Sequence, residues 1–302
     1  MIIVRIMAGA GNQMFQYALA YEFLSRGKKI KIDTTFFDTV AYEEGNTFRP
    51  SFMQELECFD LEEASEIEIN RAWKRNNSYF WRGMGLLHLL KEKHPVVTDN
   101  GKESYTWILD RSNVYLNGYW QSEDYFKNVG KLLQVKWRRA LAKQLDETNK
   151  KLAERISSNN NSVSIHIRGG DYFNKYNIER FGGVCGADYY KAAVTKLNEV
   201  INLVTDETSY YIFTNDKECA TKLLEDIFGT DKSWIFVDNP EELALTDIYL
   251  MSCCKNNIIA NSSFSWWGAY LNEYGDKKVI APKKWTATDE HQDIYCDDWI
   301  RV

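Results

Sequence analysis

The sequence lacks the features that mark secreted, membrane-spanning and metal-stapled proteins. The N-terminal apolar run, residues 2–6, is interrupted by Arg5 and has no basic stretch before it, so it does not read as a signal peptide. No stretch reaches the roughly 18 consecutive apolar residues of a membrane-spanning helix. The six cysteines include no Cys-x-x-Cys pair, and no cysteine–histidine spacing suits zinc. Scattered thiols of this kind predict a reducing, cytoplasmic setting.

Two missing motifs and the charge balance limit the chemistry. No Asp-x-Asp triplet is present, so we expect no carboxylate cluster for a hard cation, no metal and no other cofactor. The absence of a Gly-x-Ser-x-Gly elbow argues against a serine hydrolase. The 37 Lys and Arg against 43 Asp and Glu leave a net charge of −6, which excludes a dedicated duplex-binding protein. One local basic pocket for a phosphate is compatible with this balance.

Short apolar strands alternate with helices along the 302 residues. The first part of the chain predicts a strand over 2–6, a helix over 13–26 capped by Asn12 and ended by Gly27, strands over 29–33 and 114–120, and a long helical segment over 122–156. The second part predicts strands over 162–167, 209–214, 233–237, 257–260 and 278–281, and helices over 187–203, 217–228, 239–252 and 264–273. Such alternation is typical of parallel, doubly wound sheets.

A polar cluster, residues 157–161, interrupts this pattern and predicts a domain boundary. We therefore expect two Rossmann-like α/β domains, residues 1–158 and 159–302, with a cleft between them. Ligands of such sheets bind outside the carboxyl ends of the strands. The polar residues that follow each predicted strand are for this reason the candidates for function.

The first candidate is a glycine-containing turn after the first strand. Gly9 and Gly11 precede Asn12 and Gln13, but Met14 stands where a dinucleotide-binding fingerprint has its third glycine. The motif suits a plain strand-to-helix turn. It suits equally well a helix N-terminus whose amides, with Asn12 and Gln13, face an anionic ligand.

The second candidate is the end of the strand over 162–167. Side chains alternate along a strand, so His166 and Arg168 share a face opposite the isoleucines. Paired glycines and Asp171 follow, and arginine offers a bidentate fork that suits phosphate. The alternative is a buried histidine and an arginine paired with Asp171. We favour the ligand site, because these groups are concentrated at one strand end.

Two other strand ends carry polar residues. The segment 213–216 ends in Asn215 and Asp216, which by themselves are best explained as a helix N-cap. The segment 261–264 places two serines at the start of a helix, an arrangement that suits either a phosphate or an ordinary serine cap. Asp247 lies in a mostly apolar helix, so it is either exposed or accepts from a donor such as the N–H groups of guanine.

Four segments in this order and spacing resemble the α-1,2-fucosyltransferases, glycosyltransferase family 11: GAGNQMFQYA, SIHIRGGDY, FTND and ANSSFSWWGAYL. The resemblance spans about residues 4–282. It implies a GT-B-like fold with the acceptor on the N-terminal domain and the GDP-sugar donor on the C-terminal domain. It also implies metal-independent, inverting transfer of fucose from GDP-fucose to the 2-hydroxyl of a terminal galactose.

The resemblance assigns roles by position. His166 would lie near the guanine or ribose, Arg168 on the pyrophosphate, and Asp247 on the guanine. The other donor-binding candidates are Asn12 and Gln13 near the phosphate and fucose, Ser262, Ser263 and Phe264 around the phosphates, and Asn215 and Asn261. Arg168 would stabilise the departing GDP, while Asp171 or Asp216 would accept the proton of the acceptor hydroxyl.

Two positions depart from the family pattern. The family usually reads His-x-Arg-Arg-Gly-Asp, whereas Gly169 stands here in place of the second arginine. The change removes one charge-assisted contact of about 1.5–3 kcal/mol, for which Lys175 or Arg180 are candidate substitutes. Ala8 stands where the family often has glycine, and we expect that change to be minor.

Three functions stay open. We favour a bacterial α-1,2-fucosyltransferase that builds surface glycans in the cytoplasm, at the inner face of the membrane with peripheral contact. Its partners would be GDP-fucose and a galactose-terminated oligosaccharide or lipid-linked glycan, not nucleic acid. The second is a related glycosyltransferase that uses another GDP-sugar, with Gly169 marking altered donor choice. The third is a non-catalytic glycan- or nucleotide-binding protein.

Overall fold

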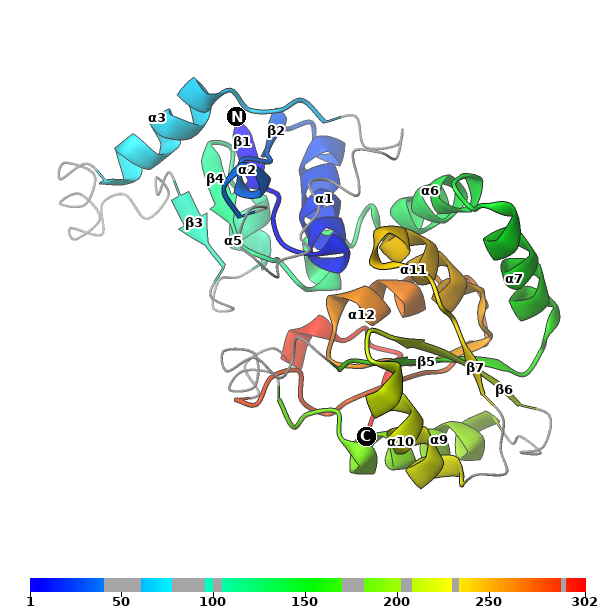
Figure 1. Cartoon of the computed structure of the whole chain (residues 1–302). Coiled ribbons are helices and arrows are strands. Elements are labelled where there is room, and N and C mark those ends of the chain that lie inside the picture. Colours follow the sequence, from blue (N-terminus) through cyan, green and yellow to red (C-terminus); the bar gives the residue numbers. More distant parts are fainter. Residues whose placement is uncertain are drawn as a thin grey trace. The chain divides into compact units, whose positions relative to one another are not determined.

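A computed structural model describes residues 1–40, 61–77, 96–99, 105–169, 182–201, 208–229, 234–288 and 292–302. The chain forms two compact units, Met1–Leu133 and Gln134–Val302. Each unit is built on a sheet whose paired strands run parallel, with helices in the connections (Figure 1). The predicted α/β class is therefore confirmed, and the two units can be described in turn.

The first unit contains a four-stranded sheet with the order β2-β1-β4-β3. Its strands are β1 (Ile2–Arg5), β2 (Ile30–Asp33), β3 (Val96–Thr98) and β4 (Val114–Asn117). Its helical elements are α1 (Ala10–Ser25), α2 (Phe36–Val40), α3 (Glu66–Asn77), α5 (Tyr105–Leu109) and the short η1 (Glu123–Tyr125). The central strand β1 is buried along most of its length because both of its edges are paired and α1 packs on it.

The turn from β1 into α1 differs from the prediction in where the helix begins. Gly9, not Asn12, occupies the N-cap position, and no side chain caps the helix. Asn12 therefore lies within the first turn of α1. At the other end, Gly27 has a φ of 70°, which is the left-handed conformation expected after a helix C-terminus.

Ala8, in the same turn, also has a left-handed backbone, with a φ of 64°. This conformation costs a residue with a Cβ about 1–2 kcal/mol, whereas glycine adopts it freely. The turn is held by neighbouring amides, because Gln13 Nε2 donates to the Ala8 carbonyl at 2.8 Å and the Met7 amide donates to Gln16 Oε1 at 2.9 Å. The alanine at position 8, where the family often has glycine, was expected to matter little. It lies at a strained position.

We expect Ala8→Gly to stabilise the first unit by about 0.5–1 kcal/mol, since the relief of strain exceeds the added entropy of the unfolded chain. Urea unfolding followed by circular dichroism measures this change. The matched control is Ala10→Gly, which makes the same change at the first residue of α1, where the backbone is not left-handed, and should not stabilise the protein. Destabilisation by both variants would contradict the strain at position 8.

The second unit contains a six-stranded sheet with the order β10-β9-β8-β5-β6-β7. Its strands are β5 (Ser162–Ile167), β6 (Ser209–Thr214), β7 (Ile235–Phe236), β8 (Asn256–Ile258), β9 (Val279–Ala281) and β10 (Ile300–Arg301). Its helical elements are α7 (Glu147–Ser158), α9 (Ala187–Ile201), α10 (Lys217–Phe228), η4 (Glu241–Leu243), α11 (Ala244–Cys253), α12 (Ser263–Tyr270) and η5 (Gln292–Ile294). Helices α9 and α10 lie on one side of this sheet and α11 and α12 on the other (Figure 1).

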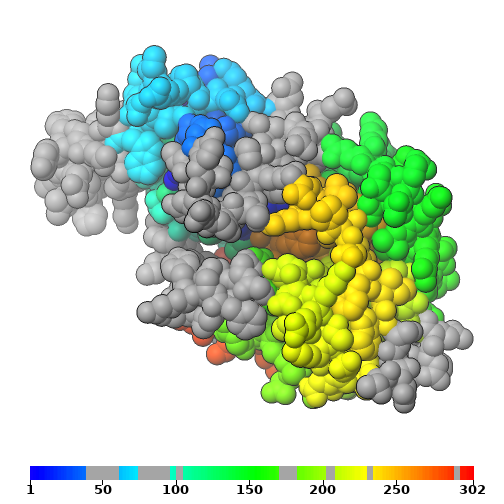
Figure 2. All heavy atoms as spheres, in the orientation of Figure 1, coloured from blue at the N-terminus to red at the C-terminus, as the bar shows by residue number. Residues whose placement is uncertain are grey.

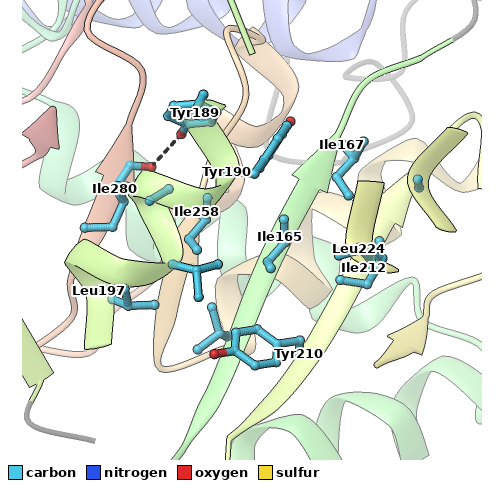
Figure 3. Close-up of a cluster of buried hydrophobic side chains, with 14 residues drawn as sticks. Ile165, Ile167, Tyr189, Tyr190, Leu197, Tyr210, Ile212, Leu224, Ile258 and Ile280 are labelled. Atoms are coloured by element: carbon cyan, nitrogen blue, oxygen red, sulfur yellow. Dashed lines mark hydrogen bonds between the residues drawn. The ribbon is translucent and has the colours of Figure 1, made fainter. Parts of the chain in front are cut away.

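The core between the sheet and α9 and α10 fixes which side chains of β5 face the other way. Ile165 and Ile167 are buried against Tyr189, Tyr190 and neighbouring apolar residues (Figure 3). The Tyr189 hydroxyl donates to the carbonyl of Ile259 and reaches that of Ile280 at 3.4 Å. With these residues on one face of β5, the alternate side chains are presented to the α12 side.

The helical segment predicted over 122–156 is divided into η1, α6 (Gly130–Lys143) and α7. Asp146 ends the continuity, because it caps α7 by accepting from the Asn149 amide at 2.7 Å. Helix α7 packs on α11, so it belongs to the second unit. The compact units accordingly divide within α6, whereas the polar cluster predicts a boundary at 158/159.

The helix predicted over 239–252 also begins later than expected. Pro240 and the two glutamates form the 3₁₀ turn η4, and α11 starts at Ala244. Asn239 does not cap this helix, because its side chain donates to Asp247 instead. No helix in the described part of the chain has the length and apolarity needed to cross a membrane.

Candidate functional site

The carboxyl ends of three adjacent strands bring predicted site residues together in the second unit. Strand β5 lies between β6 and β8, and the register pairs Ile167 with Thr214 and Ile165 with Ile258. The segments that follow these strands therefore leave the sheet side by side. They carry the three polar motifs that the sequence predicts to meet at a ligand site.

Arg168 and Ser262 join two of these motifs directly. The Arg168 guanidinium donates from Nη1 to the Ser262 hydroxyl at 3.1 Å. Ser262 is the N-cap residue of α12, but its side chain makes no capping bond to the helix. The α12 N-terminus thus keeps backbone N–H groups without a side-chain cap, next to a guanidinium. A helix N-terminus and an arginine are each well suited to binding phosphate.

His166 is buried behind this pair in an environment that keeps it neutral. Its ring lies 5.3 Å from that of Phe264, and its Nδ1 has no hydrogen-bond partner among the described residues. Burial, with a smaller contribution from the positive charge of Arg168, lowers the pKa of His166 to about 3. At neutral pH the imidazole is uncharged, so it can hydrogen-bond a ligand but it does not serve as a general base.

Gly169 is tied by its backbone to the segment after β6. Its amide donates to Asn215 Oδ1 at 2.9 Å, and Asn215 Nδ2 returns a bond to its carbonyl at 3.3 Å. A Cβ at position 169 would stand only 2.6 Å from the Cβ of Asp216. Asp216 itself is held as the N-cap of α10, where Oδ1 accepts from the Cys219 amide at 3.0 Å. The capping role predicted for Asn215 or Asp216 falls on Asp216.

Asp247 lies on α11 as the end of a chain of amide side chains. Asn239 Nδ2 donates to its Oδ1 at 2.7 Å, and Asn239 also exchanges bonds with Asn149 at 3.1 and 3.2 Å. Burial, assisted by the charge of Asp238, raises the pKa of Asp247 to about 7 despite the bond from Asn239. A carboxyl of this kind is well suited to a ligand that brings two neutral N–H donors.

The remaining predicted residues of this unit surround the α12 N-terminus. Asn261 is buried and donates to the Trp285 carbonyl at 3.1 Å, so its side chain supports the loop. Ser263 begins α12 and is, like Phe264, partly exposed. Trp266 and Trp267 are fully buried and belong to the core rather than to a pocket wall.

Two predicted residues lie in the first unit and have local partners there. Gln13 is fully buried, and its amide donates to the Ala8 carbonyl, which shapes the turn after β1. Asn12 is partly exposed and accepts from Gln121 Nε2 at 2.6 Å. Gln13 therefore has a structural role in the strand-to-helix turn. Asn12 is the more exposed of these two residues.

Asp171, Lys175 and Arg180 lie outside the described residues. The structure also shows three residues beside the predicted site residues that the sequence did not indicate: Asn239, Asn149 and Gln121. Asn239 precedes a proline at a helix start, so the sequence favours a capping role and gives no sign of its partner. The one signal in the sequence was Asp247, a carboxylate eight residues later in a mostly apolar helix, which needs a donor.

Comparison with known proteins identifies the family. The sequence model of Glycosyl transferase family 11 matches residues 74–302, which cover all three motifs of the second unit. The chain belongs to glycosyltransferase family 11. The expected resemblance is thereby confirmed, and so is the expectation of a glycosyltransferase.

Two similar proteins of Escherichia coli extend over almost the whole chain of this family 11 member. The O-antigen biosynthesis glycosyltransferase WbnK is 30% identical and covers 98% of this chain and 99% of its own. An alpha-1,2-colitosyltransferase is 29% identical and covers 100% of this chain and 98% of its own. Among solved structures, the fucosyltransferase NodZ from Bradyrhizobium is 16% identical with a TM-score of 0.46, covering 88% of this chain and 91% of that one.

Proposed function

We propose that this family 11 protein is an inverting, metal-independent α-1,2-fucosyltransferase that moves fucose from GDP-fucose to the 2-hydroxyl of a terminal galactose. The observation that carries the proposal is the contact of Arg168 with Ser262 at the uncapped N-terminus of α12. This arrangement offers a cation, a hydroxyl and free backbone amides to one pyrophosphate. The resemblance of the motifs to the family supplies the sugar and the linkage.

The chemistry of this reaction matches the charges of the site. Cleavage of the fucose–phosphate bond leaves negative charge on GDP and positive charge on the sugar. Arg168 and the α12 amides would stabilise the departing diphosphate without a metal. His166, neutral and buried, would accept or donate a hydrogen bond to the nucleoside, and Asp247 would pair with the guanine.

The proton of the acceptor hydroxyl must be removed as the hydroxyl attacks. The candidate bases are Asp171 and Asp216. One oxygen of Asp216 is engaged in capping α10, which keeps its carboxylate close to the end of β6. A weak base is sufficient here, because the sugar carries positive charge in the transition state.

The experiment that tests the proposal is GDP release from GDP-fucose with and without lactose, in buffer containing EDTA, followed by NMR of the product. Acceptor-dependent release with a new α-linkage at O2 of galactose is the expected result. Release that requires a divalent cation, or a linkage elsewhere, would overturn the corresponding part of the proposal. GDP-fucose binding without turnover, repeated with other galactosides, would favour a non-catalytic binding protein.

The similarity to an alpha-1,2-colitosyltransferase favours one alternative, transfer of another GDP-sugar. Colitose is fucose without its 3-hydroxyl. A site that hydrogen-bonds this hydroxyl rejects the deoxy sugar by about 10⁴-fold, whereas an apolar site discriminates by no more than about a hundredfold. Comparing kcat/KM for GDP-fucose, GDP-colitose and GDP-mannose therefore decides among the three donors.

The raised pKa of Asp247 makes donor binding depend on pH. Guanine N–H groups donate best to the carboxylate, so binding below about pH 7 requires loss of a proton from Asp247. We expect the affinity for GDP to fall about tenfold between pH 8 and pH 6, as measured by calorimetry. Asp247→Asn should bind more weakly at pH 8 and show a flatter profile. The β-phosphate of GDP titrates in the same way with the wild type and with Asp247→Asn. An equal change of GDP affinity with pH in the two proteins would therefore contradict the role of Asp247.

The same group affects stability in the absence of ligand. The folded-state pKa lies above the unfolded one, so the folded protein holds the proton between about pH 4 and pH 7. The stability that this proton contributes is fully present below about pH 4. It declines across this window and is lost as the pH rises through about 7. Asp247→Asn should remove this dependence, which thermal unfolding at a series of pH values would show.

A further inference from the structure

Helix α6 carries an unusual concentration of positive charge. Its 14 residues include Lys131, Lys136, Arg138, Arg139 and Lys143 and no acidic residue, in a chain whose net charge is −6. Helical geometry places residues 132, 136, 139 and 143 on one narrow stripe, because they follow one another at intervals of four, three and four. The basic stripe therefore consists of Leu132, Lys136, Arg139 and Lys143.

Packing of the opposite face fixes the stripe toward solvent. Leu133, Trp137 and Leu141 are buried, and the Trp137 ring lies 4.9 Å from that of Trp267. All four stripe residues are exposed, and Leu132 keeps 54% of its surface accessible. On the face shown in Figure 2, the green segment that contains α6 and α7 lies at the surface. The apolar face of α6 is packed inside the protein, so the stripe offers a ligand three cations and one exposed leucine.

The cations of the stripe have no acidic partner among the residues that the structure describes. Lys136, Arg139 and Lys143 make no ion pair with any residue in the described part of the chain. Arg138, on the flank of the helix, is by contrast bonded to Ser252 and paired with Glu273. Three exposed lysines on other helices do have acidic partners one turn away, in the pairs Lys150–Glu147, Lys196–Glu199 and Lys222–Glu218.

We propose that the basic stripe of α6 binds the surface of an anionic phospholipid membrane. A lipid bilayer is the occupant that fits a straight, solvent-facing row of cations with an apolar residue at one end, because the lysine stems and Leu132 can enter the interface while the charges meet phosphates. A single-stranded nucleic acid fits less well, because the stripe has no aromatic side chain on which bases could stack. The inference goes beyond the proposed transferase activity and does not depend on it.

Sedimentation of the full chain with vesicles tests the proposal. We expect binding to vesicles that contain phosphatidylglycerol but not to pure phosphatidylcholine. Binding should weaken between about 0.1 M and about 1 M salt, where the Debye length falls from about 10 Å to about 3 Å. Because each Lys or Arg near an anionic surface contributes about fivefold, neutralising three should lower the affinity about a hundredfold. The variant K136Q/R139Q/K143Q makes this change on the stripe.

The matched control is K150Q/K196Q/K222Q, which removes the same charge from paired, exposed lysines. It should bind vesicles like the wild type, and Leu132→Ala should weaken the binding that persists at high salt. Absence of binding by the wild type, or equal loss in both triple variants, would overturn the proposal. Tighter binding to RNA than to vesicles would assign the stripe to another partner. Turnover of soluble acceptors and thermal unfolding show whether each variant is intact, so a failure here is distinct from a failure of the proposed function.

Discussion

Arg168→Ala is expected to lower kcat for acceptor-dependent GDP release by about a hundredfold to a thousandfold. The guanidinium is anchored by Ser262 beside the uncapped end of α12, so it is already in place when negative charge develops on the departing diphosphate. Its loss removes an interaction that is stronger in the transition state than in the ground state. The effect should therefore appear in kcat more than in KM, and Arg168→Lys should recover only part of it because lysine lacks the bidentate fork.

The control for this prediction is Arg301→Ala. Arg301 is an exposed arginine on β10, at the far edge of the same sheet, so its removal changes the net charge equally. We expect its kcat to be unchanged. A second variant, Ser262→Ala, keeps the cation but removes its anchor, and should reduce kcat by about tenfold. A wild-type kcat in Arg168→Ala, with only KM raised, would show that Arg168 binds the donor uniformly and does not stabilise the leaving group.

Gly169→Arg, which restores the usual family residue, is expected to damage this protein rather than improve it. The new Cβ would stand 2.6 Å from the Cβ of Asp216, a distance that requires one of the two segments to move. Asp216 is held by its capping bond to Cys219, and Gly169 by its paired bonds to Asn215. Overpacking of this kind costs about 1–3 kcal/mol. We expect a lower thermal midpoint and weaker GDP binding.

Two further variants separate the clash from the charge. Gly169→Ala introduces the same Cβ without a cation and should lose similar stability. In G169R/D216G the clash is removed, and glycine at an N-cap costs only a few tenths of a kcal/mol. Its stability should recover, and GDP affinity should rise about tenfold or more if the added guanidinium reaches the diphosphate. Tighter GDP binding by the single variant Gly169→Arg, at unchanged stability, would contradict the geometry described for this site.

Strands and amphipathic helices with clear local signals could be predicted closely from the sequence. The bounds of β5, β6 and α10 match the predicted residues, because each combines a continuous apolar run or period with a polar residue at its end. The alternation along β5 also predicted that His166 and Arg168 lie opposite the isoleucines. The division between α6 and α7 was not predictable in the same way, since both are rich in helix formers and only the capping by Asp146 separates them.

The pairing of polar groups at the site depends on tertiary contacts that no local pattern records. Ser262 has the sequence signature of a helix cap, yet its hydroxyl accepts from Arg168 instead. Asn239 likewise precedes a proline at a helix start, but it is directed to Asp247 by its contact with Asn149. The consequence of Gly169 is equally non-local, because the obstacle to a side chain there is Asp216, on the neighbouring strand end.

The order of strands in the second sheet also affects when the proposed donor site can form as the chain folds. Arg168 and Ser262 are 94 residues apart in the sequence, and their contact requires the pairing of β5 with β8, although β6 and β7 lie between these two strands in the sequence. Parallel strand pairs that are so far apart in the sequence form slowly. The entropy cost of closing the intervening loop arises before the stabilising contacts have formed. In refolding, the ability to bind GDP should therefore lag behind the recovery of helix and sheet. A nascent chain that contains Arg168 but not yet α12 would have only part of the proposed phosphate site.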